Sequence, residues 1–206
     1  MRIESLKRLA SGHAAVRLED GTELPTTLGV VAEMRLFAGR ELDEEALGRL
    51  RAESGRALAR EKALSIVSRR QMSAMELRRK LRDKGVTDDD ADYCVNWMRE
   101  RELLDEPGYA AAVVRHYGAK GYGEGRIRQE LLRRGIPRGL WEEALSAMPE
   151  EEGAAKLDRF IAARLRDPDD RGDVRRVSAA LSRRGYSEEN IRAALARFGA
   201  GTAYEE

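Results

Sequence analysis

Residues 77–87 read LRRKLRDKGVT, and the same pattern returns fifty residues later as IRQELLRRGIP (127–137) and again as VSAALSRRGYS (177–187). In every copy two aliphatic residues stand four apart, and a glycine follows four residues after the second, at Gly85, Gly135 and Gly185. Another aliphatic residue comes ten residues after each glycine, at Val95, Leu145 and Leu195. Self-similarity at a fixed period is typical of repeat proteins, so the sequence predicts three tandem copies of one helical unit.

The local chemistry of the repeat favours helices over strands. Aliphatic residues four apart lie on one face of a helix, and such a stripe buries itself against a neighbour. Glycine commonly ends a helix because it adopts the left-handed conformation without strain, so Gly85, Gly135 and Gly185 are expected to be structural helix caps. A helix-starting residue stands two positions after each glycine, at Thr87, Pro137 and Ser187. Each unit is therefore expected to hold three short helices.

The first repeat is expected to open with a helix over residues 56–70 that carries Leu64 and Val67 inward. Its second helix opens with Ser73-Ala-Met-Glu76, a capping box in which a hydroxyl and a carboxylate satisfy free backbone N–H groups. Its third helix is expected over residues 87–100. We interpret the two tryptophans as core residues that fill the gaps between helices: Trp97 and Trp141.

Prolines mark the helix boundaries of the later repeats. The first helix of the second repeat is expected to start at Pro107, and the third to run from Pro137 to just before Pro149. In the third repeat, residues 167–170 read DPDD and are expected to separate the first two helices, while Ser187 caps the last.

The N-terminal stretch has a different pattern. Two short extended runs, residues 15–18 and 22–24, flank Asp20-Gly21, a dipeptide that suits a tight hairpin turn, so we expect a small β-ribbon. Thr27 can cap a helix that holds Val30, Val31, Met34 and Phe37 and stops at Gly39, and Asp43 can cap another that runs into the fifties.

Composition agrees with a modular helical protein. Aromatic residues make up 5% and charged residues 36% of 206 residues, which does not favour one bulky core. We therefore predict an all-α fold of tandem three-helix repeats in an elongated array, with a small N-terminal β-ribbon plus helix. The expected divisions are an N-terminal lead-in (1–55) and three repeats (56–104, 105–149 and 150–206).

A net charge of +1 conceals a charge separation between helices. Over 76–84 five bases stand against two acids, over 126–134 four bases against one acid, and over 176–184 three bases against none, so each second helix carries +3. The start of each third helix is acidic, at residues 88–92, 142–143 and 188–189. The basic side chains of the second helices are Arg78, Arg79, Lys80, Arg82, Lys84, Arg126, Arg128, Arg133, Arg134, Arg176, Arg183 and Arg184.

Two interpretations of these basic side chains stay open. A recurring basic stripe fits an extended partner of negative or mixed charge. Basic residues near a helix C-terminus also stabilise the helix through its dipole, so the stripe could be a solvated face alone.

The sequence offers no convergent set of groups for catalysis. The two histidines, His13 and His116, give neither a metal cluster nor a catalytic triad, and we expect no cofactor and no metal. Residues 118–125 contain four glycines but no Gly-Lys-Ser/Thr, so we interpret them as an inter-helix turn. Cys94 lies on an apolar helix stripe, and we interpret it as a buried structural thiol rather than a nucleophile.

The single cysteine suits a reducing compartment, and no apolar run reaches the roughly 20 residues that span a bilayer. The N-terminus MRIESLKRL has no apolar stretch of the signal-peptide kind. We therefore expect a cytoplasmic protein that does not bind membranes.

Two strings resemble the RecX family of regulatory proteins. The first is the pattern Ser73-x-x-Glu76-Leu77-x-x-Lys80-Leu81-x-x-Lys84-Gly85 with its Asp-rich continuation. The second is Lys120-Gly121-x-Gly123-x-x-Arg126-Ile127-x-x-Glu130-Leu131-x-x-Arg134-Gly135-Ile136. The likeness covers about residues 56–199. The third repeat departs from it, with Ser178 and Ala180 where the first has Arg78 and Lys80.

This resemblance implies a non-enzymatic modulator of the RecA recombinase that lies in the groove of the RecA filament on single-stranded DNA. It implies inhibition of RecA's ATPase, strand exchange and coprotease activities. The candidate contacts to filament or DNA are then Lys120 and the basic residues of the second helices. We expect a monomer. Two other readings stay open: a helical-repeat protein that binds DNA directly, and a helical scaffold for other proteins.

Overall fold

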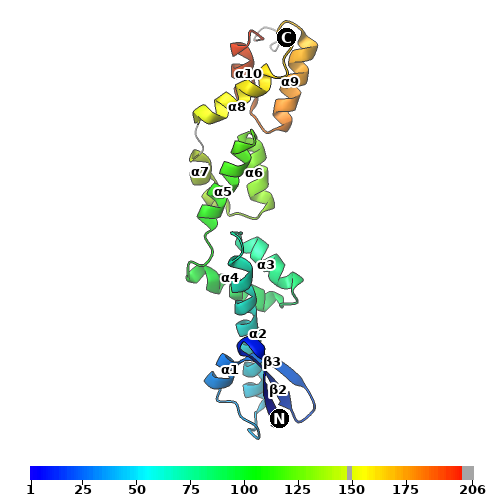
Figure 1. The fold of residues 1–206 in the computed structure, drawn as a ribbon, viewed down its shortest axis with the longest axis vertical. Coiled ribbons are helices and arrows are strands. Elements are labelled where there is room, and N and C mark those ends of the chain that lie inside the picture. Colours follow the sequence, from blue (N-terminus) through cyan, green and yellow to red (C-terminus); the bar gives the residue numbers. More distant parts are fainter. Residues whose placement is uncertain (148–149, 201–206) are drawn as a thin grey trace. The chain divides into compact units, whose positions relative to one another are not determined.

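The computed structural model describes residues 1–147 and 150–200 (Figure 1). It forms two compact units, one of residues 1–72 with 76–104 and one of residues 73–75 with 105 onward. The strands are β1 (Ile3–Arg8), β2 (His13–Leu18) and β3 (Glu23–Thr27). The helices that lie wholly or mainly in the first unit are α1 (Leu28–Glu33), α2 (Glu44–Val67), α3 (Ala74–Asp83) and α4 (Asp88–Glu100). Those of the second are α5 (Glu106–Ala119), α6 (Glu124–Arg133), α7 (Trp141–Ser146), α8 (Glu150–Ala162), α9 (Arg171–Arg183) and α10 (Glu188–Arg197).

The three strands form an antiparallel sheet in the order β1-β2-β3. The predicted hairpin is confirmed: Val16 of β2 pairs with Leu24 of β3, and the turn holds Gly21 at a φ of 83°. The predicted ribbon was incomplete, because β1 adds a third strand in which Leu6 pairs with Val16. Its apolar residues, Ile3 and Leu6, are three apart and do not show the alternation that marks a strand.

Capping side chains set the starts of the two helices that follow. The hydroxyl of Thr27 accepts the N–H of Val30 at the start of α1, and the carboxylate of Asp43 accepts the N–H of Ala46 at the start of α2. α1 ends at Glu33, so the expectation that this helix runs on to Gly39 was wrong. The chain leaves the helix through Arg35, which has a φ of 50°.

α2 is one helix, whereas the sequence predicted a break near residue 55. Gly55 lies inside α2 where α2 packs on α4: a Cβ there would lie 2.5 Å from a carboxylate oxygen of Asp90. The inward face of the second half of α2 holds Ala59, Ala63 and Ile66. Leu64 is 43% exposed, so the expectation that it points inward was wrong.

The N-terminal sheet, α1 and the first half of α2 share one core. Its fully buried side chains include Ile3, Val16, Leu18 and Leu50. This core is built from strands and helices together and draws on residues 3–57.

The same helix end is built three times. Gly85, Gly135 and Gly185 have φ values of 77°, 65° and 86°. In each case the next residue donates its N–H to the leucine four residues before the glycine: Val86 to Leu81, Ile136 to Leu131 and Tyr186 to Leu181, at 3.1, 3.0 and 3.3 Å. This is the hydrogen-bond pattern of a Schellman motif, which satisfies carbonyls that the helix end leaves free.

The second and third repeats each have a core of their own. In the second, Tyr109, Val113, Ile127 and Leu131 pack with Trp141, which is buried as predicted. The indole N–H of Trp141 donates to the carbonyl of Ile136. Trp97 is only partly buried, and the guanidinium groups of Arg60 and Arg101 lie over its ring. The core of the third repeat holds Leu157, Ile161, Val177, Leu181 and Ile191.

The third helical segment of the second repeat is interrupted. A turn of 3-10 helix at Arg138–Leu140 precedes α7, so regular α-helix begins at Trp141 and not at Pro137. Pro149, the predicted stop, lies outside the described residues. Across the described residues, no helix is both long and apolar enough to cross a membrane.

Candidate functional site

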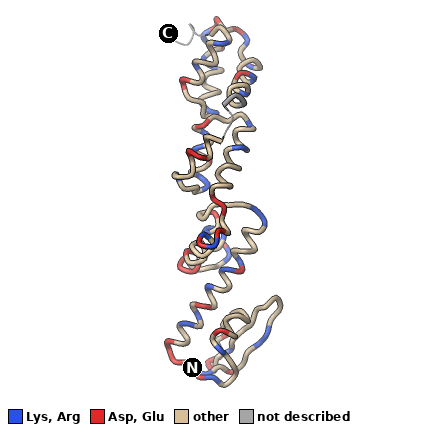
Figure 2. Tube along the Cα trace, turned by 90° about the vertical axis from the view of Figure 1, so that its left-hand side faces the viewer, with Lys and Arg blue, Asp and Glu red and all other residues tan. Residues whose placement is uncertain are grey.

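The predicted basic residues of the second helices lie on α3, α6 and α9 and at the turns that follow these helices, and Lys120 follows α5. Figure 2 shows the Lys and Arg residues of the chain in blue. Because the repeats are fifty residues apart, each side chain can be compared with its equivalents. This comparison distinguishes arginines that bind a carboxylate on another helix of the same repeat from arginines whose side chains are exposed to solvent.

Arg78 and Arg128 occupy the same place in the first two repeats and make the same contact. The guanidinium of Arg128 donates to both carboxylate oxygens of Glu142, at 2.8 and 3.0 Å, and that of Arg78 donates to both oxygens of Asp92. Hydrogen bonds from these arginines hold the pKa of both carboxyls below the usual range. Both arginines thus tie the second helix to the third.

The other basic residues of the first repeat are more exposed. Arg82 lies 2.8 Å from Asp88, and Arg79 is exposed. Lys80 is half-buried. Lys84 is exposed, and its backbone carbonyl accepts a hydrogen bond from the ammonium of Lys62.

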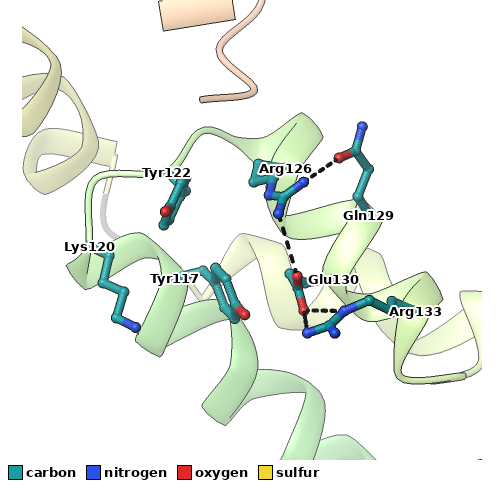
Figure 3. Close-up of a pocket in the computed structure, with 7 residues that line it drawn as sticks. All are labelled: Tyr117, Lys120, Tyr122, Arg126, Gln129, Glu130 and Arg133. Carbon is teal, nitrogen blue, oxygen red and sulfur yellow. Dashed lines mark hydrogen bonds and ion pairs between the residues drawn. The ribbon is translucent and has the colours of Figure 1, made fainter. Parts of the chain in front are cut away.

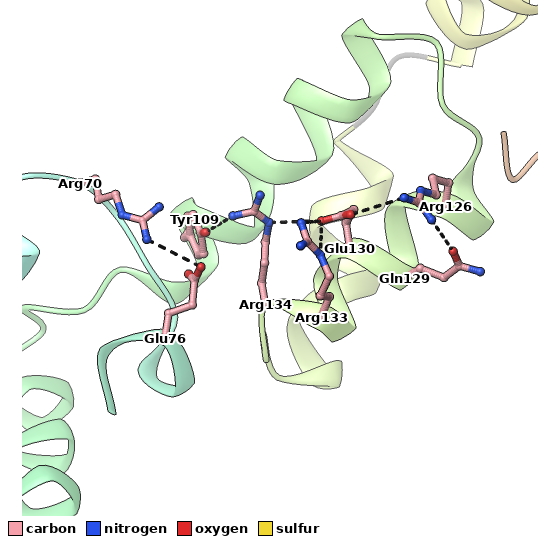
Figure 4. Close-up of polar contacts among 8 residues, drawn as sticks. All are labelled: Arg70, Glu76, Tyr109, Arg126, Gln129, Glu130, Arg133 and Arg134. Carbon is pink, nitrogen blue, oxygen red and sulfur yellow. Dashed lines mark hydrogen bonds and ion pairs between the residues drawn. The ribbon is translucent and has the colours of Figure 1, made fainter. Parts of the chain in front are cut away.

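A cluster on α6 surrounds one buried carboxylate (Figure 4). Glu130 accepts hydrogen bonds from Arg133 at 2.7 and 3.1 Å, and Arg126 and Arg134 lie 3.9 and 3.7 Å away. Burial alone would raise the pKa of Glu130, but the hydrogen bonds from Arg133 and Tyr117 and the nearby charges lower it. Three guanidinium groups share one carboxylate, so the cluster has an excess of positive charge.

α9 repeats part of this arrangement. Arg126 and Arg133 of α6 correspond to Arg176 and Arg183 of α9, and all four are exposed. Residues seven apart lie on one helix face. Arg176 forms an ion pair with Asp173, a buried carboxylate that also accepts the N–H groups of the preceding loop. At the positions of these arginine pairs the first repeat has Glu76 and Asp83. The pair of exposed arginines seven residues apart therefore occurs in the second and third repeats and is absent from the first.

Arg134 and Arg184, at the ends of α6 and α9, are half-buried and have structural contacts. Arg134 donates to the hydroxyl of Tyr109. Arg184 donates to the carbonyls of Lys120 and Gly121, at 3.3 and 3.1 Å, and lies over the ring of Phe160. Arg184 therefore holds the third repeat against the glycine-rich turn of the second.

The structure also brings forward two residues that the sequence reasoning did not select. Tyr117 and Tyr122 line a hollow of about 570 Å³ in the second repeat, together with Lys120, Arg126, Gln129, Glu130 and Arg133 (Figure 3). The sequence does contain a signal for this hollow, because Tyr117 and Tyr122 stand on either side of Lys120. The four glycines of residues 118–125 led to the interpretation of this segment as a turn alone.

Of the residues considered for catalysis, His13 and Cys94 belong to the first unit, and His116 lies beside Tyr117, with ring centroids 5.3 Å apart. Cys94 is fully buried, and burial raises the pKa of its thiol to about 11. His13 lies 2.7 Å from Glu61, between β2 and α2. Within residues 1–147 and 150–200, no group of three or more His, Cys, Asp or Glu side chains is placed to hold a metal ion.

Sequence comparisons identify relatives of both the repeats and the longer chain. A family model described as the first three-helix domain of RecX matches residues 59–98, and one described as the second matches residues 105–145. Regulatory protein RecX of Pseudomonas entomophila is 34% identical over 137 residues, which cover 64% of this chain and 86% of that protein. Regulatory protein RecX of Limosilactobacillus reuteri is 27% identical over 190 residues, covering 90% of this chain and 71% of that one.

Solved structures share the fold. A crystal structure of regulatory protein RecX superposes with a TM-score of 0.77 at 23% identity, covering 95% of this chain and 98% of that chain. The crystal structure of RecX from Lactobacillus salivarius gives 0.62 at 19% identity, covering 70% of this chain and 97% of that chain.

Proposed function

This chain belongs to the family of RecX regulatory proteins, and we propose that it binds the filament that RecA forms on single-stranded DNA and inhibits RecA's ATPase, strand exchange and coprotease activities. The protein acts by binding and has no catalytic step of its own. Its partners are the RecA filament and the DNA strand within it.

The observation that supports this proposal is the matched set of exposed arginines on α6 and α9. Arg126, Arg133 and Arg176 have side chains that are 45%, 68% and 61% exposed. Their local carboxylates, Glu130 and Asp173, are buried and lie beneath them. Guanidinium groups keep their charge at physiological pH and present several donors to carboxylates and phosphates.

Repetition of this surface suits a partner that is itself repetitive. A RecA filament offers identical protomers at a regular spacing. Two modest contacts on one chain reinforce each other, because the first engagement raises the effective concentration of the second. Such a protein can act at substoichiometric amounts, since one chain bridges neighbouring protomers.

Co-sedimentation with RecA filaments tests binding, and RecA's DNA-dependent ATP hydrolysis tests inhibition. We expect the protein to pellet with filaments and to suppress hydrolysis at less than one chain per RecA protomer. Unchanged hydrolysis in the presence of excess protein would contradict the inhibitory role. ATP hydrolysis by the purified protein alone would contradict the absence of catalysis.

The double variant Arg126→Gln with Arg133→Gln tests the arginines. Glutamine is chosen because a new glutamate beside the buried Glu130 would destabilise the helix by like-charge repulsion. We expect filament binding to fall at least about tenfold, since charged interface contacts are commonly worth ~1–3 kcal/mol each. The matched control is Arg49→Gln with Arg51→Gln, which removes the same charge from exposed positions of α2. Equal binding by both variants would assign the α6 arginines to a solvated face.

A second candidate function is direct binding of DNA, which the basic hollow with its two tyrosines favours. Salt dependence distinguishes the two functions. Phosphate contacts make log affinity fall steeply with log salt, whereas docking on a protein groove gives a shallower fall. Binding to bare single-stranded DNA without binding to the filament would support the second function and reject the first.

A further inference from the structure

We propose that the hollow between α5 and α6 is a binding site for one unstacked nucleotide of single-stranded DNA. The base stacks on the ring of Tyr117 and lies beside Tyr122, and its flanking phosphates contact Lys120, Arg126 and Arg133. This inference deepens the proposed function and rests on it, because the strand is the one that the protein meets in the filament.

The hollow has the size and the lining that a nucleotide requires. Its volume of about 570 Å³ lies within the roughly 300–1,000 Å³ of small-ligand pockets. Tyr117 comes from the end of α5 and Tyr122 from the turn before α6, and their ring centroids lie 5.6 Å apart at an interplanar angle of 48°. Both rings are half-buried, so each keeps some exposed surface.

The charges around the rings favour an anion. Figure 3 shows the ammonium of Lys120 on one side of the tyrosines and the guanidinium of Arg126 on the other. Three cations, Lys120, Arg126 and Arg133, stand against the single carboxylate of Glu130, which leaves an excess of two positive charges among the lining residues. Burial acts to raise the pKa of Glu130, but hydrogen bonds from Arg133 and Tyr117 and the charges of Arg133 and Arg134 lower it.

Aromatic rings and cations around one hollow select a ligand that is both planar and anionic. Proteins that bind single strands combine a positive surface that follows the backbone with aromatic side chains on which bases stack. Bases of a duplex are already stacked and paired, so they cannot enter without being extruded. The geometry therefore points to an unpaired base with its phosphates.

The test uses the full-length protein, without RecA, and two fluorescent probes of equal length. One probe is an oligothymidylate and the other is an abasic strand with the same number of phosphates. Anisotropy at low salt should show the wild type binding the oligothymidylate at least about fivefold more tightly, because stacking of one base contributes a factor of roughly 5 to 140 in affinity.

Tyrosine variants test whether the preference for oligothymidylate over the abasic strand arises in the hollow. Tyr117→Leu should bring the two affinities close to equality, whereas Tyr117→Phe, which keeps the ring, should retain the preference. Tyr93→Leu is the matched control, because Tyr93 is a half-buried tyrosine under an arginine, on α4 and outside the hollow. Circular dichroism and thermal unfolding check that each variant is folded.

Equal affinity of the wild type for the two probes, or no binding of either, would overturn the proposal without any variant. A preference that survives in folded Tyr117→Leu and in Tyr122→Leu would place the stacking elsewhere and overturn it too. None of these outcomes depends on filament binding. Failure of the nucleotide site and failure of the proposed function are thus separate results.

Discussion

Gly123 and Gly185 touch through their backbones, where the second repeat meets the third. A Cβ on Gly123 would lie 2.5 Å from the carbonyl carbon and oxygen of Gly185. The N–H of Gly123 donates to the carbonyl of Arg184 at 2.9 Å, and that of Gly125 donates to the carbonyl of Gly185 at 2.9 Å. The glycine-rich segment is therefore the docking surface for the helix end of the next repeat.

Gly123→Ala is expected to destabilise this joint. Gly123 has a φ of −77°, which alanine adopts without strain, so the cost comes from the clash alone. The opposing atoms are backbone, and overpacking of this kind costs about 1–3 kcal/mol. Urea unfolding measures the change. Gly139→Ala is the control, because a Cβ there meets nothing within 4 Å, and equal stability of the two variants would contradict the close approach.

Arg184→Lys is expected to lower stability by ~1 kcal/mol although the charge is kept. The planar guanidinium of Arg184 lies 4.7 Å from the ring centroid of Phe160 and 5.4 Å from that of Tyr122 while it donates to two carbonyls. An ammonium cannot reproduce this combination of stacking and hydrogen bonding. Arg183→Lys, at the exposed neighbouring position, should stay within about 0.5 kcal/mol of the wild type. Thermal unfolding compares the two, and a larger loss for Arg183→Lys would refute the assignment.

Arg128→Met should lower stability at neutral pH, and the loss should shrink in acid. Arg128 holds the pKa of Glu142 below its unfolded value. The pair therefore stabilises the fold above the unfolded pKa, about 4.3, and that contribution disappears as the pH falls through the lower folded pKa. Unfolding midpoints at pH 7, 5 and below 4 measure it. The control Arg79→Met should show a smaller loss of stability at pH 7. If the stability difference between the wild type and Arg128→Met grew as the pH fell, the prediction would be contradicted.

Cys94 is expected to be unreactive in the native protein. Its thiol is 0% exposed and has a pKa of about 11, so only on the order of one thiol in a thousand is ionised at pH 8. A thiol-reactive chromogenic disulfide should modify it quickly in concentrated urea and very slowly without urea. Fast modification of the folded protein would contradict this expectation and would show that the packing of α4 around Cys94 opens readily.

Sequence alone determined the features that depend on a few consecutive residues. Leucines four apart at Leu77 and Leu81 specify a helix face, and Thr27, Asp43 and Ser187 mark helix starts because their side chains accept N–H groups three residues on. The all-α repeat architecture followed from such local signals, as did the hairpin at Gly21.

Only the tertiary structure decided which distant groups meet. The sequence shows Arg78 and Arg128 as basic residues of one stripe, but their pairing with Asp92 and Glu142 depends on how the second helix packs on the third. Likewise the sequence predicted one helix ending in the fifties and another starting at residue 56, whereas α2 runs unbroken through Gly55, where it packs on α4. Tyr117 and Tyr122 line one hollow because α5 and α6 fold back on each other. Local conformation is governed by neighbours in the chain, whereas charge pairing and close approach are governed by packing.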